Sequence, residues 1–197
     1  MTECGPAIAF DHWQTFRPTS CGKAVDRMEI RIDSSDPFNQ VGEILTKGMN
    51  VMDGYYNNPE ASNTVLSPNG WLHTGDLGVL DPDGYLYIKG RSKSLILGPS
   101  GQNIYPEEIE DLLNAQPYIA ESLVIEREGK LVALVYPDAE AMKQNKISCE
   151  TLLKIIHETR KQINQQLPAY SQIARIEIHD EEFEKTPKRS IKRFLYQ

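Results

Sequence analysis

The hydrophobic and polar positions of the chain predict strands and one short helix in its first half. Apolar and polar residues alternate over residues 27–33, which predicts a strand, and residues 41–48 predict a second strand antiparallel to it. Residues 57–66 predict a short helix, because Pro59 stands near its start, where a missing N–H costs little. Residues 71–91 alternate on both sides of an Asp-Pro-Asp-Gly turn and predict a β-hairpin.

Strands and helices are mixed in the second half. Residues 94–97 predict a short strand, followed by a glycine-bearing loop. Residues 106–117 predict a helix, because proline and acidic residues open it and a proline ends it. Residues 120–138 predict a second hairpin with Glu128-Gly129 near its tip.

The longest helix is predicted over residues 147–170. Apolar residues recur there near helical spacing, Ser148 is a candidate N-cap and Pro168 ends the pattern. Residues 173–180 predict a last strand. The order of elements changes near residues 91–94, so we expect a boundary there between a strand-rich part and a compact part of about 100 residues.

Composition excludes several classes of protein. No apolar run approaches the ~18 residues that a membrane helix needs, and the N-terminus does not have the pattern of a secretory signal. The three cysteines are widely spaced without a metal-ligand pattern, which favours a reducing compartment, the cytoplasm. A net charge of −7 argues against nucleic-acid binding. Residues 185–193 nevertheless carry five basic residues and no acid, either as a solvated end or as a local anion site.

A few polar residues have types suited to nucleotide chemistry. Thr2 and Glu3 form a hydroxyl–carboxylate pair that can serve Mg²⁺ and its attached phosphate. Asp76 could accept hydrogen bonds from a vicinal diol such as a ribose, or could cap local N–H groups in a turn. Arg91 could bind phosphate and ribose oxygens, or pair with a surface carboxylate. Each of these residues is weak evidence by itself.

The glycine loop and the histidines can each be interpreted as functional or as structural features. The loop with Gly98 and Gly101 would let backbone approach a ligand closely, although such a loop also occurs wherever a strand reverses. The four histidines are scattered, and none has a close histidine or cysteine partner that would suggest a metal site. We therefore interpret all four as structural or surface residues.

The ordered set of motifs is more specific than its parts. "MTECGP", "GWLHTGDLG", "GRSKSLI", "GPSGQNIYPEEIE" and a basic C-terminus follow one another at characteristic offsets. In this respect the chain resembles the adenylate-forming (AMP-binding) enzymes over nearly its whole length. It looks most like the C-terminal portion of a bacterial acyl-CoA synthetase, and among these enzymes it resembles a long-chain fatty acid–CoA ligase.

The resemblance implies a fold and two domains. The fold is α+β, with an antiparallel β-barrel-like subdomain followed by a small mobile α+β domain. Residues 1–92 would be the C-terminal end of the large domain, and residues 93–197 the small domain. These enzymes join a carboxylic acid to ATP with Mg²⁺, and a thiol, usually coenzyme A, then displaces AMP. A carrier-protein arm is an open alternative for the thiol.

The resemblance also implies roles for single residues. Thr2 and the Mg²⁺-associated Glu3, together with Asp76 and Arg91, match the residues that contact the nucleotide. Lys93 matches the hinge about which the small domain swings. The loop around Gly101 matches the segment that serves the thiol step.

The basic tail departs from the family pattern. Ser190 stands in the position of the expected adenylation lysine, with Lys188 and Lys192 two residues away on either side. Either lysine could supply the missing charge, since side chains two apart share a face in an extended chain.

The chain also begins inside a motif, so the phosphate loop and most of the acyl pocket have no counterpart in it. We therefore expect it to be inactive alone. The alternative is a non-catalytic association module, in which apolar surface exposed by the truncation drives self-association or partner binding.

Overall fold

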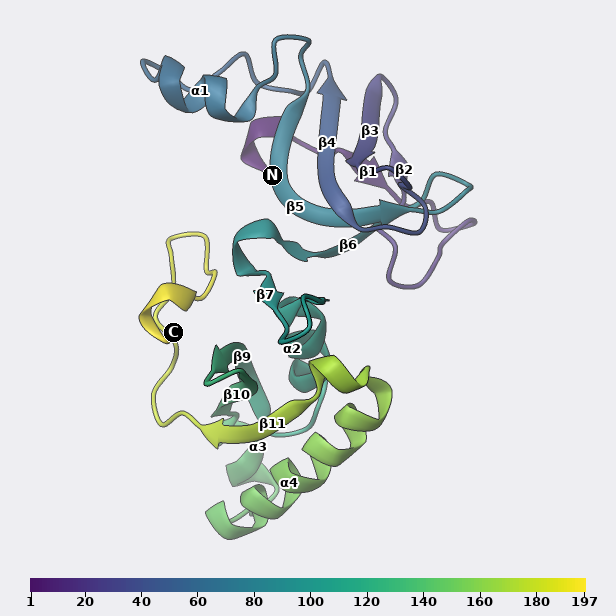
Figure 1. Ribbon diagram of the computed structural model, residues 1–197. Helices are drawn as coiled ribbons and strands as arrows, with labels where there is room; N and C mark the ends of the chain where they lie inside the picture. The colour runs from purple at the N-terminus through teal and green to yellow at the C-terminus, as the bar shows by residue number, and fades with distance from the viewer. The chain divides into compact units, whose positions relative to one another are not determined.

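The protein consists of two compact units, Met1–Lys93 and Ser94–Gln197. A computed structural model describes residues 1–197 in full (Figure 1). Both units mix helices with sheets whose pairings are mostly antiparallel, which confirms the α+β fold class. No helix of the protein combines the length and the apolar character required to cross a membrane.

The first unit contains a four-stranded antiparallel sheet. Its strands are β3 (Met28–Asp33), β4 (Gly42–Gly48), β5 (Leu72–Leu80) and β6 (Leu86–Arg91), hydrogen-bonded in that order. The expected strand pair and the expected hairpin are therefore both present. The sheet is open, because β3 and β6 are its edges, and β5 is strongly bent along its length (Figure 1).

The remaining elements of the first unit are short. The 3₁₀ turn η1 (Thr2–Cys4) precedes the two-stranded sheet of β1 (Ala9–Phe10) and β2 (Lys23–Ala24). Helix α1 (Pro59–Val65) starts at the expected proline, and the Asn58 side chain caps it by accepting from the N–H of Ala61 at 3.0 Å. Apolar residues from β3, β4 and β6 form the core of the four-stranded sheet, namely Ile32, Ile44 and Leu86.

The second unit is built on a three-stranded sheet. Strands β9 (Ile119–Arg127) and β10 (Lys130–Pro137) form the expected antiparallel hairpin, turning through Glu128 and Gly129, which both have positive φ. Strand β11 (Ile173–Ile178) pairs with β10 in parallel. A parallel pair requires a long crossover, and the longest helix lies in that connection.

Three helices belong to the second unit. Helix α2 (Pro106–Asn114) follows the small hairpin of β7 (Ile96–Leu97) and β8 (Asn103–Ile104). Helix α4 (Cys149–Gln166) begins after the expected N-cap, since the Ser148 hydroxyl accepts from the N–H of Thr151 at 3.2 Å. The sequence did not predict α3 (Ala139–Gln144), a short helix of 6 residues, none of which is buried.

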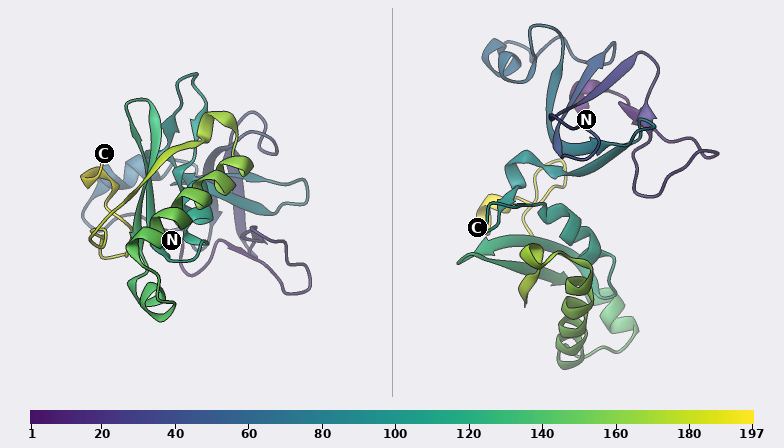
Figure 2. Two further views of the ribbon diagram at one scale, coloured as in Figure 1. Left: turned by 90° about the horizontal axis from the view of Figure 1, so that it is seen from below. Right: turned by 45° about the vertical axis from the view of Figure 1, so that its right-hand side comes forward.

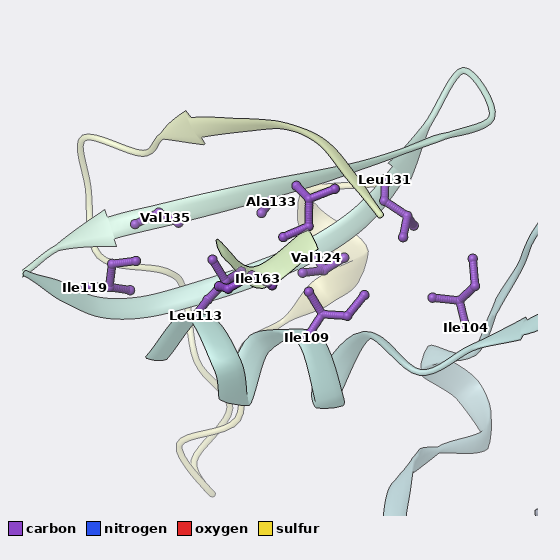
Figure 3. Packing of buried hydrophobic residues seen from close by; sticks show 10 residues of the cluster. Ile104, Ile109, Leu113, Ile119, Val124, Leu131, Ala133, Val135 and Ile163 are labelled. Carbon is purple, nitrogen blue, oxygen red and sulfur yellow. The ribbon is translucent and has the colours of Figure 1, made fainter. Parts of the chain in front are cut away.

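The two faces of the three-stranded sheet are covered differently, because successive strand residues point to opposite sides. On one face, Leu131, Ala133 and Val135 of β10 pack against α2 and α4 (Figure 3). The left view of Figure 2 shows α4 beside β11. On the other face, Val132 and Leu134 pack against the C-terminal segment, whose Phe183 is buried at 2% exposure. The basic tail is therefore anchored on the sheet.

Candidate functional site

The two ends of the first hairpin meet in the structure. Asp76 and Arg91 are cross-strand partners on β5 and β6, and the Arg91 Nε lies 3.0 Å from the Asp76 Oδ1. The Asp76 side chain is 24% exposed and the Arg91 side chain 60% exposed. A partly shielded carboxylate beside an accessible guanidinium can offer an acceptor and a donor to one polar ligand.

Strand β5 bulges at Asp76. Glu43 pairs with Leu77 and Leu45 pairs with His73, so residues 74–76 of β5 stand opposite the single residue 44 of β4. Gly75 has φ +72°, and a side chain there would meet no atom within 4 Å, so backbone conformation is what favours glycine at this position. Bulges re-aim side chains, and this one directs Asp76.

Side chains satisfy the backbone of the bulge. The Thr74 hydroxyl accepts from the N–H of Asp76 at 3.0 Å and donates to the carbonyl of Ile44 at 2.7 Å. The Glu43 Oε1 accepts from the N–H of Gly75 at 2.9 Å. A buried N–H that loses its ladder partner needs such a replacement.

The N-terminal pair lies in the same unit. The hydroxyl of Tyr55 donates to the Glu3 Oε1 at 3.2 Å, and the Glu3 carbonyl accepts from the N–H of Met52 at 2.9 Å. Partial burial and then the charge of Glu3 raise the pKa of Tyr55 above its ordinary value. Glu3 and Thr2 supply the oxygen donors that Mg²⁺ prefers.

Thr2 and Glu3 could supply only part of the ligand set of a Mg²⁺ ion. The chain has no group of three or more histidine, cysteine, aspartate or glutamate residues that could hold a metal. A Mg²⁺ ion here would take most of its ligands from water and phosphate, which is its usual mode of binding in phosphate-handling sites.

Lys93 and the glycine loop lie near the middle of the chain. Lys93 is exposed in the 3₁₀ turn η2 (Ser92–Ser94) and is the last residue of the first unit. The β7–β8 turn closes through the N–H of Gly101, which donates to the Gly98 carbonyl at 2.9 Å. Gly101 has φ +79° with open space around it, so its backbone can take this conformation without strain and stays accessible.

The basic tail contains a tight turn that separates the two candidate lysines. The N–H of Thr186 donates to the Ser190 carbonyl at 2.8 Å, and the N–H of Arg189, which has φ +61°, donates to the Thr186 carbonyl at 2.8 Å. Lys188 is therefore exposed at the tip of the turn. Lys192 lies past the turn, with its Nζ 3.0 Å from the Glu184 Oε2.

A buried ion pair fixes the end of this tail. Arg193 donates to the Glu110 Oε2 and, at 3.2 Å, to the Val124 carbonyl, while the Glu110 Oε1 accepts from the N–H of Val124 at 2.6 Å. Glu110 is only 8% exposed. Burial raises the pKa of Glu110, and the opposing effect of Arg193 and the Val124 N–H only partly offsets it.

Sequence reasoning missed the residues that support the site. Glu43 was not singled out and Thr74 entered only as part of the GWLHTGDLG motif, because their roles depend on an irregular register that periodicity does not reveal. Glu110 could have been found, since it stands between Ile109 and Leu113 on the buried side of the predicted helix. Among the histidines, His73 makes a defined contact, with its Nδ1 2.8 Å from the Glu43 Oε2.

Comparison with known proteins identifies the class of domain. Residues 93–196 match the family described as AMP-binding enzyme C-terminal domain. The chain therefore belongs to this family, which confirms the resemblance to adenylate-forming enzymes.

Curated relatives are CoA ligases. A 2-succinylbenzoate–CoA ligase of Bacillus cereus (strain AH820) is 39% identical over 143 residues, which are 71% of this chain and 29% of that protein. An indoleacetate–CoA ligase of Aromatoleum aromaticum is 44% identical over 124 residues, which are 59% of this chain and 24% of that protein. The chain thus spans about three tenths or less of these relatives. Their acids differ, so they do not favour a fatty acid.

Solved structures of CoA ligases are similar to this chain over all or nearly all of its length. The O-succinylbenzoate coenzyme A synthetase from Bacillus subtilis in complex with AMP has a TM-score of 0.78 and 29% identity, covering 100% of this chain and 39% of that one. The anthranilate CoA ligase AuaEII in complex with anthranoyl-AMP has a TM-score of 0.81 and 26% identity, covering 99% of this chain and 36% of that one.

Proposed function

We propose that the chain is the C-terminal portion of an ATP-dependent acyl-CoA ligase. Such an enzyme converts a carboxylic acid and ATP to an acyl-adenylate and pyrophosphate, and the thiol of coenzyme A then displaces AMP to give the thioester. The observation that carries the proposal is the pairing of Asp76 with Arg91 at a built bulge, in a chain of the AMP-binding family. The three free cysteines support a cytoplasmic location.

In this proposal the first unit holds the nucleotide. Asp76 accepts hydrogen bonds from the two ribose hydroxyls, and Arg91 donates to ribose or phosphate oxygens through its fixed fork. Glu3 and Thr2 would hold Mg²⁺, which supplies positive charge against the phosphates when bound. Charge-assisted hydrogen bonds of this kind are stronger than neutral ones, so Asp76 is the main determinant of nucleotide affinity in this part of the site.

The second unit contributes in two poses. For adenylation, we assign the missing lysine to Lys188, because the turn exposes it whereas Glu184 holds Lys192. A positive charge at the carboxylate and the α-phosphate stabilises the charge that develops there. For the thiol step, rotation about Lys93 replaces this turn by the Gly101 loop, whose open backbone leaves room for a pantetheine arm.

A second candidate is an association module without catalysis. It is favoured by one observation, the exposure of large apolar side chains in the first unit: Trp13 is 80% exposed and Tyr56 93% exposed. Such a module would need no selectivity for nucleotides, so nucleotide binding discriminates between the two candidates.

The chain alone is expected to release no pyrophosphate from ATP, Mg²⁺ and a panel of carboxylic acids, because its match to the 2-succinylbenzoate–CoA ligase covers only 29% of that protein. A fusion of this chain to the upstream part of the B. cereus 2-succinylbenzoate–CoA ligase is expected to release pyrophosphate with succinylbenzoate. A coupled pyrophosphate assay measures both. Turnover by the chain alone would refute the expectation that its active site is incomplete. A fusion that folds and binds succinylbenzoate but shows no turnover would refute the ligase assignment.

A further inference from the structure

We propose that Glu43 is a positioning residue for ribose recognition, an inference that rests on the proposed function. Glu43 lies on β4, across the sheet from the bulge that carries Asp76. Its carboxylate is 27% exposed and makes two contacts with β5, one through each oxygen. It therefore acts on the ribose only through the backbone of β5.

The first contact replaces a hydrogen bond that the bulge removes. Residues 74–76 stand opposite a single residue of β4, so their N–H groups cannot all pair with the β4 backbone. The Glu43 Oε1 accepts the N–H of Gly75 at 2.9 Å. This bond holds the Thr74–Gly75 peptide, which is next to the Gly75–Asp76 peptide, so it limits the conformations of Gly75 and with them the direction of the Asp76 side chain.

The second contact orients the carboxylate itself. The Glu43 Oε2 lies 2.8 Å from the His73 Nδ1, and the His73 Nε2 lies 3.1 Å from the Ser67 hydroxyl. A carboxylate only accepts, so Nδ1 carries a proton, and in the neutral ring Nε2 accepts from Ser67. This chain of contacts fixes the plane of the Glu43 carboxylate and hence the point at which it meets Gly75.

Thr74 completes the arrangement from the other side. Its hydroxyl accepts from the N–H of Asp76 at 3.0 Å and donates to the Ile44 carbonyl at 2.7 Å. The N–H groups of Gly75 and Asp76 are thus each held by a side chain. A carboxylate that must meet two hydroxyls at once is sensitive to its direction, because a misaligned hydrogen bond weakens steeply.

The consequence is a selectivity effect. In the parent protein, we expect AMP to bind about tenfold or more tightly than 2′-deoxy-AMP, because Asp76 loses one charge-assisted hydrogen bond with the deoxy ligand. Glu43→Ala leaves Asp76 in place but frees the Gly75 peptide, and we expect the ratio of the two dissociation constants to fall to about twofold or less, since a misdirected carboxylate forfeits most of that bond.

The test measures both ligands by calorimetric titration of the full chain. Glu43→Gln keeps an oxygen that can accept from Gly75, so it should restore most of the ratio. Glu29→Ala is the matched control, because Glu29 is an exposed carboxylate on β3 of the same sheet. Amide exchange of Gly75, followed by NMR without ligand, should accelerate in Glu43→Ala and not in Glu29→Ala. If Glu43→Ala does not fold, Glu43→Asp, which retracts the carboxylate by one methylene, takes its place.

The outcomes separate the inference from the proposed function. An unchanged ratio in a folded Glu43→Ala protein, or unchanged Gly75 exchange, overturns the positioning role of Glu43 while the nucleotide site stands. A parent protein that binds neither ligand overturns the proposed function, and with it the selectivity claim. A purely structural role for Glu43 would weaken both ligands equally and is recognised by an intact ratio.

Discussion

An Arg193→Ala variant is expected to lower the free energy of unfolding of the second unit by about 3–5 kcal/mol, the usual cost of breaking a buried ion pair from one side. The change leaves the Glu110 carboxylate, which is only 8% exposed, without its cationic partner. It also removes the donor that reaches the Val124 carbonyl. The tail that carries the Lys188 turn would lose its anchor on α2 and β9.

The chain provides its own probes for this measurement. Both tryptophans, Trp13 and Trp71, lie in the first unit, whereas α2, α3 and α4 lie in the second. Because the first unit has only the short helix α1, circular dichroism at the helical band in a urea titration follows mainly the second unit, and tryptophan fluorescence follows the first. Only the circular dichroism transition should move. Lys192→Ala, which breaks the more exposed pair with Glu184, is the matched control and should cost about 1 kcal/mol or less.

The effect of Arg193→Ala should also depend on pH, with a definite sign. Burial raises the pKa of Glu110 in the folded state, and removing Arg193 raises that pKa further. A carboxyl group with a raised pKa contributes stability below its unfolded value of about 4.3 and loses it as pH rises through the folded value. The destabilisation should therefore be largest at pH 7 and smaller in mild acid. A loss that is equal at both pH values, or below about 1 kcal/mol, would contradict a buried pair.

A Lys188→Ala change in the fusion described above is expected to lower the rate of adenylation by about 10²–10³-fold, the typical effect of removing one preorganised electrostatic group. Lys192→Ala should lower it by less than about tenfold, because that lysine is already engaged with Glu184. Pyrophosphate release with succinylbenzoate measures the step. Thioester formation from added acyl-adenylate should be kept in both variants, since the other pose serves it.

The two lysine variants test each other. A large loss in Lys192→Ala with none in Lys188→Ala would reverse the assignment and imply that the Thr186–Ser190 turn opens in the complete enzyme. Unchanged adenylation in both would leave the tail without a catalytic role. Lys188→Arg gives a further check, because it keeps the charge at the tip of the turn and should retain part of the rate.

Regular elements were predictable where a simple period governs burial. The hairpin of β5 and β6 follows from alternation around the Asp81–Gly84 turn, whereas the pairing of Asp76 with Arg91 depends on a register shift between Leu77 and Gly78. Helix α4 follows from its apolar spacing and its serine cap. Helix α3 was missed because it is short and buries no residue, so it leaves no periodic signal.

The contacts that support the site could not be predicted from the sequence, for a physical reason. The bulge places more residues of β5 than of β4 between two paired positions, and it leaves no recognisable pattern in the sequence. The sequence therefore does not reveal that the Glu43 side chain accepts from the N–H of Gly75. The position of Lys188 depends on the positive φ of Arg189, a conformation that non-glycine residues adopt infrequently. Residue types and the order of the motifs therefore predicted a nucleotide ligand, whereas the contacts around Asp76 and Lys188 depend on register and turn geometry.

Titration of AMP into the full chain and into Asp76→Ala would show whether this chain carries the ribose-binding part of an adenylate-forming ligase. We expect weak, saturable binding to the parent protein and an affinity at least about tenfold lower in the variant, because a charge-assisted hydrogen bond to the ribose is lost. Circular dichroism must show that both proteins are folded. Equal affinity for AMP in the two folded proteins, or no binding to either, would contradict the account.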